Sequence, residues 1–249
     1  GLPADYIANH KPGPDGKVTL DINYPDYVPV MTYAKSDEVR RRLYMEFQNR
    51  AHPKNLEVLD RLIAQRHELA NLLGFPTYAE YITANKMVGS PKNARDFIDR
   101  IVAASGTSAD RDYQVLLRRK QKDVPGATMV NFWETSYWSE AVRKSDYAFD
   151  SQTVRPYFPY ARVKQGVLDL MSRLFGVTFK QVKGAPVWDP SVECWEMFEA
   201  GKLVGRFYLD MHPRENKFNH AAQFDVRTGV TGRQIPEAAL VCNLPGGTP

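Results

Sequence analysis

The residues whose types and spacing come closest to a catalytic set are in the run His67-Glu68-Leu69-Ala70-Asn71. Two histidines four positions apart on a helix project both imidazoles from one face onto a zinc ion, and a glutamate between them activates the metal-bound water. Here the second histidine position is Asn71, whose amide is a poor zinc ligand beside a neutral imidazole. The run therefore predicts a polar stripe on the solvent side of an amphipathic helix rather than a zinc site.

A second group of metal-ligating side chains lies in the segment 210–220, which reads DMHPRENKFNH. Asp210, His212, Glu215 and His220 combine carboxylates with imidazoles, and that combination suits zinc. However, Pro213 interrupts the run, and the spacing matches no recurrent metal-binding pattern. We interpret these side chains as strand-end and loop residues, and we assign no catalytic residue and no metal ligand to this chain.

Other catalytic signatures are absent from the sequence. It contains neither the Gly-x-Gly-x-x-Gly run of a phosphate-binding turn nor the Gly-x-Ser-x-Gly run of a serine hydrolase. Cys194 and Cys242 lack the context of a catalytic cysteine; two buried free thiols are the simpler interpretation, although a disulfide between them stays open. Aromatic side chains at helical spacing favour packing over a ligand groove, namely Trp133, Tyr137 and Trp138.

The elements that must position these residues are predicted to be helical as far as about residue 176. Ser36 and Ser90 are N-cap residues, and Pro91 follows Ser90 at the first helical position. Thr77 and Glu80 have the spacing of a capping box, and Gly74 and Gly176 end helices. The expected helices cover 36–51, 53–74, 77–86, 90–123, 132–144 and 160–175, with a turn at 154–158. Residues 1–30 are expected to form a loop segment that carries one strand, at 17–24.

After residue 176 the pattern changes to short, β-prone stretches separated by turn residues. The expected strands are Val177–Val182, Val192–Glu199, Leu203–Met211, Phe218–Val226 and Ala238–Asn243. Ala200-Gly201 predicts a hairpin turn between the second and the third. We therefore expect a mainly α protein with a small, mostly antiparallel sheet near the C-terminus, and two regions: helical 1–176 and a sheet segment 177–249.

The overall composition is that of a soluble globular protein, with 43% hydrophobic and 25% charged residues. No apolar run approaches the roughly 20 residues that cross a bilayer, so no membrane partner is expected. The net charge is +4, but basic and acidic residues are interspersed: the run Arg40–Arg42 follows Asp37 and Glu38. A nucleic-acid-binding protein needs a clustered basic face, so no nucleic-acid partner is expected either.

Several stretches taken together resemble the thimet oligopeptidase family of zinc metallopeptidases, which includes neurolysin, oligopeptidase A and dipeptidyl carboxypeptidase. The resemblance covers nearly the whole chain and is carried by these runs: GLP, YPDYVPVMTYAKSDEVRRRLY, NLEVLDRLIAQRHELANLLGFPTYAEYITANKMVGSP, WETSYWSEAVRKSDY, RPYFPYARVKQGVLDLMSRLFGVTF, VWDPSVECWEMFE, GRFYLDMHPRENKFNHAAQF and ALVCNLPGG. The order Tyr-x-Asp, Pro-Arg-Glu, Lys, His-Ala-Ala is specific in combination. One departure is Asn216, where the family usually has Gly before the Lys.

The resemblance implies a partial zincin-like oligopeptidase fold and a parent enzyme that hydrolyses short peptides with a zinc ion. In the family, the His-Glu-x-x-His helix follows the segment that ends here at Pro249, so we expect this chain to lack the zinc and to be inactive alone. The sheet segment would flank the catalytic helices, and an edge strand would pair with the backbone of the substrate. His220, Ala221 and Gln223 are the candidate substrate-binding residues, with interior sheet residues as the alternative.

Three function classes remain open at this point. The chain is a fragment of a cytoplasmic oligopeptidase, or a non-catalytic peptide-binding or scaffolding module, or, on net charge alone, a nucleic-acid binder. The fragment hypothesis leads. Because a fragment would leave one face of its sheet without covering helices, it also predicts self-association.

Overall fold

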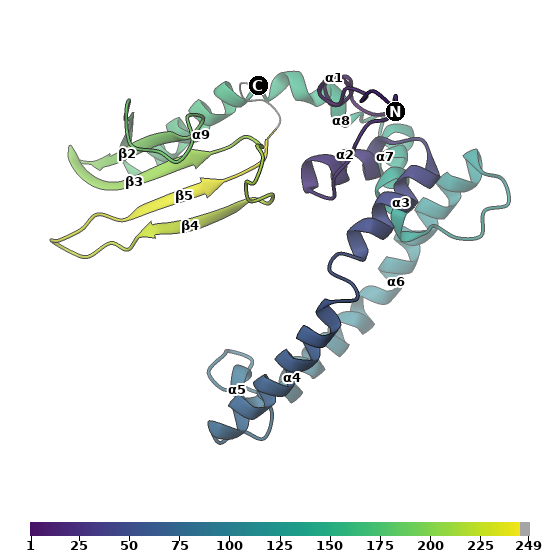
Figure 1. Cartoon of the computed structure of the whole chain (residues 1–249), viewed down its shortest axis with the longest axis horizontal. Coiled ribbons are helices and arrows are strands. Elements are labelled where there is room, and N and C mark those ends of the chain that lie inside the picture. Colours follow the sequence, from purple (N-terminus) through teal and green to yellow (C-terminus); the bar gives the residue numbers. More distant parts are fainter. Residues whose placement is uncertain (245–249) are drawn as a thin grey trace. The chain divides into compact units, whose positions relative to one another are not determined.

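A computed structural model of the chain describes residues 1–244 and shows helices followed by one sheet (Figure 1). The final residues of the run ALVCNLPGG lie outside that range. The chain divides into two compact units. One consists of Gly1 with Met31–Ala148, and the other of Leu2–Val30 with the chain from Phe149 onward.

The N-terminal prediction of a loop with a strand at 17–24 is wrong. Helix α1 covers Ala4–Asn9, residues 17–23 form no strand, and helix α2 covers Tyr24–Tyr33. The alternation of Val18, Leu20 and Ile22 that suggested a strand finds no neighbouring strand to pair with, and Val18 is 42% exposed. The backbone amide of Tyr27 instead donates to the carbonyl of Asn23 at 2.8 Å, which begins the first turn of α2.

The first unit is built from helices, and three of them begin at the N-caps that the sequence predicts. The helices of this unit are α3 Asp37–Gln48, α4 Asn55–Leu72, α5 Tyr78–Thr83, α6 Pro91–Asp123, η1 Phe132–Glu134 and α7 Thr135–Asp146. The side chains of Ser36, Ser90 and Thr77 each accept a backbone N–H in the first turn of their helix. Helix α4 is followed by Gly74 at φ 82°, a left-handed conformation that suits glycine.

Buried charges join the helices of this unit. Lys120 of α6 donates to the Glu134 carboxylate at 2.7 Å, and the Glu134 residue is 4% exposed. Burial alone would raise the pKa of Glu134, but the hydrogen bonds from Lys120 and the Asn131 backbone outweigh it and leave that pKa below its ordinary value. The Trp133 indole donates to the Asp37 carboxylate at 3.1 Å, so η1 is attached to α6 and to α3.

The second unit places helix α9 before the sheet. Helices α8 Ser151–Val154 and η2 Arg155–Tyr157 lead into α9 Tyr160–Phe175, which ends at Gly176 with φ 69° and contacts β1. The strands are β1 Val177–Gln181, β2 Glu193–Glu199, β3 Lys202–Asp210, β4 Ala222–Arg227 and β5 Glu237–Val241. All of the predicted strands after residue 176 are therefore present.

The sheet has the strand order β1-β2-β3-β5-β4, and Figure 1 shows β2, β3, β5 and β4 side by side in that order. The pairs β1–β2, β2–β3 and β4–β5 are antiparallel, whereas β3 and β5 are parallel, so the sheet is mixed. Ala200 and Gly201 form the predicted hairpin turn, with φ 46° and 79°. β4 follows β3 in the chain, but β5 lies between them in the sheet. β4 therefore forms one edge of the sheet.

One face of the sheet has a small core of its own. Cys194, Tyr208 and Ala239 pack together from β2, β3 and β5, and the segment after β1 covers them with Val182, Ala185 and Val187. Both cysteines are free thiols, Cys194 buried and Cys242 half-buried. Burial raises the pKa of both thiols, which suits a packing role rather than a reactive one.

Many large apolar side chains remain exposed on the helices. On α4, Leu56, Leu59 and Ile63 are 51%, 50% and 58% exposed. The same holds for Phe97, Ile98 and Ile101 on α6. Within residues 1–244, no helix combines the length and the apolar character that crossing a membrane requires.

Candidate functional site

The three predicted substrate-binding residues lie together where the chain enters β4. His220 and Ala221 precede the strand, and Gln223 is its second residue, opposite Leu240 of β5. All three are exposed. The ring of His220 packs against the edge of Tyr24, with centroids 5.0 Å apart, and the Gln223 amide donates to Asp225 at 2.8 Å. The described strands leave the outer edge of β4 unpaired.

The loop between β3 and β4 is held in place by Lys217. Its ammonium donates to the backbone carbonyls of Asp210, His212 and Cys242, at 3.0, 2.6 and 2.6 Å. These carbonyls belong to the end of β3, the loop itself and the end of β5. Asn243 adds a hydrogen bond from its amide to the Phe218 carbonyl at 3.0 Å. The entrance to β4 is therefore fixed to the ends of β3 and β5.

Asp210, at the end of β3, organises the same corner. Its carboxylate accepts two hydrogen bonds from the Arg214 guanidinium, at 2.6 and 2.9 Å, and one from the Trp188 indole at 2.9 Å. Lys217 forms an ion pair with it at 2.8 Å. Burial alone would raise the pKa of Asp210, but these donors outweigh it and lower that pKa to about 2. Asp210 lies at the end of β3, and its carboxylate is buried among these donors rather than on the surface.

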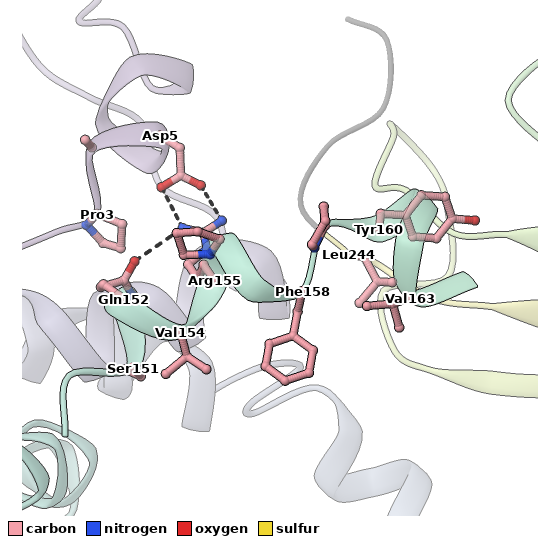
Figure 2. Close-up of a pocket in the computed structure, with 13 residues that line it drawn as sticks. Pro3, Asp5, Ser151, Gln152, Val154, Arg155, Phe158, Tyr160, Val163 and Leu244 are labelled. Carbon is pink, nitrogen blue, oxygen red and sulfur yellow. Dashed lines mark hydrogen bonds and ion pairs between the residues drawn. The ribbon is translucent and has the colours of Figure 1, made fainter. Parts of the chain in front are cut away.

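A hollow of about 1050 Å³ opens elsewhere in the second unit, between α1, the α8–η2 turn and the start of α9 (Figure 2). Most of its lining is apolar, including Phe158, Val163 and Leu244. The Arg155 guanidinium faces the Asp5 carboxylate with two contacts of 3.0 and 2.7 Å and holds the pKa of Asp5 below its ordinary value despite partial burial. None of the predicted site residues lines this hollow.

Comparison with known proteins decides the family. The family model for peptidase family M3 matches residues 30–249, most of the chain. The chain belongs to peptidase family M3. Within that family, oligopeptidase A of Escherichia coli (strain K12) is 32% identical over 263 residues, covering 98% of this chain and 38% of the relative. Saccharolysin of Saccharomyces cerevisiae is 31% identical, covering 93% of this chain and 35% of the relative.

A third M3 relative, the thimet-like oligopeptidase of Dictyostelium discoideum, is 27% identical and covers 100% of this chain and 40% of the relative. The chain thus spans about two fifths of the length of the relatives it matches. The resemblance to oligopeptidases inferred from the sequence is confirmed, and the similarity extends over both units.

The motif-like run of this M3 chain is an ordinary helix surface. His67 and Asn71 lie one turn apart on α4, both exposed, and the Asn71 amide contacts the His67 ring nitrogen Nε2 at 3.1 Å. Within residues 1–244, no three His, Cys, Asp or Glu side chains gather in a way that could hold a metal ion. The described residues therefore do not fit a zinc site.

The departure from the family pattern at Asn216 has a conformational explanation. Asn216 has φ 58°, in the left-handed region that glycine adopts freely and asparagine tolerates. The loop thus keeps the turn that a glycine would make, and Lys217 still reaches its carbonyls. Tyr24, which packs against His220, was expected at the end of a strand and is instead the first residue of α2.

Proposed function

We propose that this chain is part of a zinc-dependent oligopeptidase that hydrolyses short peptides, and that its own contribution is to bind the peptide rather than to cleave it. Membership of peptidase family M3 and the oligopeptidase names of the relatives support the peptidase activity. In this proposal the sheet segment 177–249 flanks the catalytic helices of a zincin-like fold.

The observation that carries the proposal is the free outer edge of β4. An edge strand offers backbone N–H and C=O groups that an extended peptide can pair with, which provides affinity without requiring particular side chains. The contacts of Lys217 and Asn243 hold the entrance to β4 in place. Peptide binding therefore costs little conformational entropy for ordering this loop. His220, Ala221 and Gln223 are the residues that we propose touch the peptide at that entrance.

Zinc and the groups that act with it are proposed to lie outside this chain. The two groups of side chains that resembled ligands have other partners: His67 contacts Asn71, and Asp210 is occupied by Arg214 and Lys217. We therefore propose that this chain alone carries no cofactor and no catalytic residue. For the parent enzyme we propose the cytoplasm; one relative, from Arabidopsis thaliana, has the name probable cytosolic oligopeptidase A.

The test has two parts. Metal analysis of the purified chain after dialysis should find no stoichiometric zinc, and a quenched fluorescent peptide should not be cleaved. One tightly bound zinc per chain with chelator-sensitive turnover would overturn the assignment of chemistry to other residues.

The second part concerns binding at β4. A labelled extended peptide should bind the chain, and N-methylation of alternate peptide amides should abolish binding because it removes backbone donors. Gln223→Ala should change affinity little. Equal binding of the methylated and unmethylated peptides would refute edge pairing.

A non-catalytic peptide-binding or scaffolding module is the alternative, and the same free edge supports it. The downstream gene sequence separates the two. A reading frame that continues into His-Glu-x-x-His supports the enzyme, and a stop codon after Pro249 supports the module. We also propose that the isolated chain self-associates through its exposed apolar helix faces.

A further inference from the structure

Charged side chains of alternating sign lie directly opposite one another across the whole sheet. In strand order they are Lys180 on β1, Glu196 on β2, Arg206 on β3, Glu237 on β5 and Arg227 on β4. Directly opposed residues share one face of a sheet. The sheet therefore carries a row of charges of alternating sign that ends in a cation at each edge, Lys180 on β1 and Arg227 on β4.

The inner members of this row are in contact. Arg206 donates to the Glu196 carboxylate at 2.7 Å and lies 3.7 Å from the Glu237 carboxylate. The Tyr208 hydroxyl donates to the other Glu237 oxygen at 3.0 Å, and Glu237 is 6% exposed. The three inner residues, Glu196, Arg206 and Glu237, therefore each have an oppositely charged residue on both neighbouring strands. Glu237 also accepts the hydrogen bond from Tyr208.

Among the described strands, Arg227 has a neighbour on one side, as Lys180 does at the other edge. Its guanidinium lies 3.6 Å from the same Glu237 oxygen that Arg206 approaches, and its side chain is 54% exposed. A hollow of about 370 Å³ lies beside Arg206, Glu237 and Arg227. The carboxylate of β4, Asp225, is opposite Ala238 and so lies on the other face, where it accepts from Gln223.

We propose that the peptide strand that pairs with β4 places a Glu or Asp side chain opposite Arg227, two residues away from an apolar side chain opposite Phe224. This rests on the proposed edge pairing. Opposite charges placed directly across two strands stabilise the pairing, and like charges destabilise it. A carboxylate at this position continues the alternation of the row, and a lysine or arginine there breaks it.

The spacing of the two positions follows from β5, the strand already paired with β4. Ala239 lies opposite Phe224 and Glu237 lies opposite Arg227, so β5 presents an apolar residue and an acidic residue two positions apart. A register shift between Asp225 and Arg227 keeps that pairing. Phe224 is 44% exposed and lies on the same face as Arg227, which gives the apolar side chain of the peptide a surface to cover.

The experiment compares two blocked, labelled peptides of alternating Thr and Val, one with a central Glu and one with Gln in its place, binding to the 249-residue chain by fluorescence anisotropy. Acetyl and amide ends remove terminal charges, so only the side-chain carboxylate differs. The Glu peptide should bind about two- to fivefold more tightly. The preference should disappear in about 1 M salt, where the screening length is near 3 Å.

Arg227→Gln should reduce the Glu preference, measured as the ratio of the two peptides' affinities for this variant, to near one. Arg227→Lys keeps the charge and should retain the preference. Lys202→Gln is the matched control, because it removes an exposed cation from the first residue of β3. This variant should also retain the Glu preference. If Arg227→Gln does not fold, Arg227→Lys and the salt series still decide the question.

Equal affinities of the two peptides for the unmodified chain would overturn this inference and leave edge pairing intact. A Glu preference that survives Arg227→Gln would also overturn it. If neither peptide binds, edge pairing fails and the charge preference fails with it.

Discussion

Replacing Asp210 by Asn tests whether the corner that holds the entrance to β4 depends on one buried carboxylate. The substitution keeps the size and shape of the side chain and removes its charge. Asp210 is 2% exposed, and the Lys217 side chain that it pairs with is 3% exposed. The variant therefore leaves a buried ammonium without its counter-charge.

The size of the effect follows from the protonation of Asp210. A pKa lowered from an ordinary 3.8 to about 2 corresponds to about 2 kcal/mol of stability at neutral pH. Removing one partner of a buried ion pair typically costs about 3–5 kcal/mol. Here Lys217 keeps its three carbonyl acceptors and Arg214 keeps Asp189 at 3.3 Å, so we expect a loss of about 2–3 kcal/mol.

Urea unfolding followed by tryptophan fluorescence measures the loss, because Trp188 donates to Asp210 and reports on this corner. Asp225→Asn is the matched control: it removes an exposed carboxylate whose neighbour is Gln223, and it should change the free energy of unfolding by less than about 0.5 kcal/mol. Equal effects of the two substitutions would refute the reasoning.

The stability difference between the unmodified chain and Asp210→Asn should also depend on pH, in a defined direction. A carboxyl group whose pKa is lowered by folding contributes its full stability above its unfolded pKa and loses it as the pH falls through the folded value. The difference between the unmodified chain and Asp210→Asn should therefore shrink by about 2 kcal/mol between about pH 4 and pH 2. A difference that is independent of pH in this range would show that charge is not the cause.

Three further predictions concern the helices and the loop. Ile63→Glu should weaken concentration-dependent self-association in sedimentation velocity, since Ile63 is 58% exposed on the apolar stripe of α4; unchanged association would exclude this stripe. Asn216→Ala should lower the free energy of unfolding by about 1 kcal/mol, and Asn216→Gly should not, because only the alanine is strained at φ 58°; equal urea midpoints would contradict this. Ser90→Ala should lower the free energy of unfolding by about 1 kcal/mol in the same assay, because the serine hydroxyl accepts a hydrogen bond from the Asn93 backbone N–H at 3.1 Å. Ser90→Asp keeps a cap acceptor and should restore that stability.

Local signals predicted the helices and strands well wherever one residue type enforces one conformation. The N-caps Ser36 and Ser90 and the helix-ending Gly176 appear at the expected places. The signals failed before residue 34. There, alternating apolar residues without a partner strand suggested β structure, and Pro29 inside α2 argued against a helix. Propensity cannot show whether a second strand is available to pair with.

The candidate site could be predicted only as far as local sequence reaches. The segment around His220 was identified from its resemblance to the family, but the position of β4 at the sheet edge follows from the parallel pairing of β3 with β5, which brings together residues about thirty positions apart. The opposition of Arg227 and Glu237 depends on that order and on a register shift in β4. Neither feature has a local sequence signal.

Within residues 1–244 the outer edge of β4 is unpaired, and an open edge can accept an extended backbone from another chain. Charged side chains are a common protection, and β4 carries Asp225 on one face and Arg227 on the other. A strand that pairs with β4 lies beside both charges, so the same residues that would select an acidic peptide also disfavour like charges placed opposite them. Large apolar side chains are also exposed on α4 and α6. We therefore expect self-association of the isolated chain to proceed through these helices, and a peptide that occupies β4 should leave it unchanged.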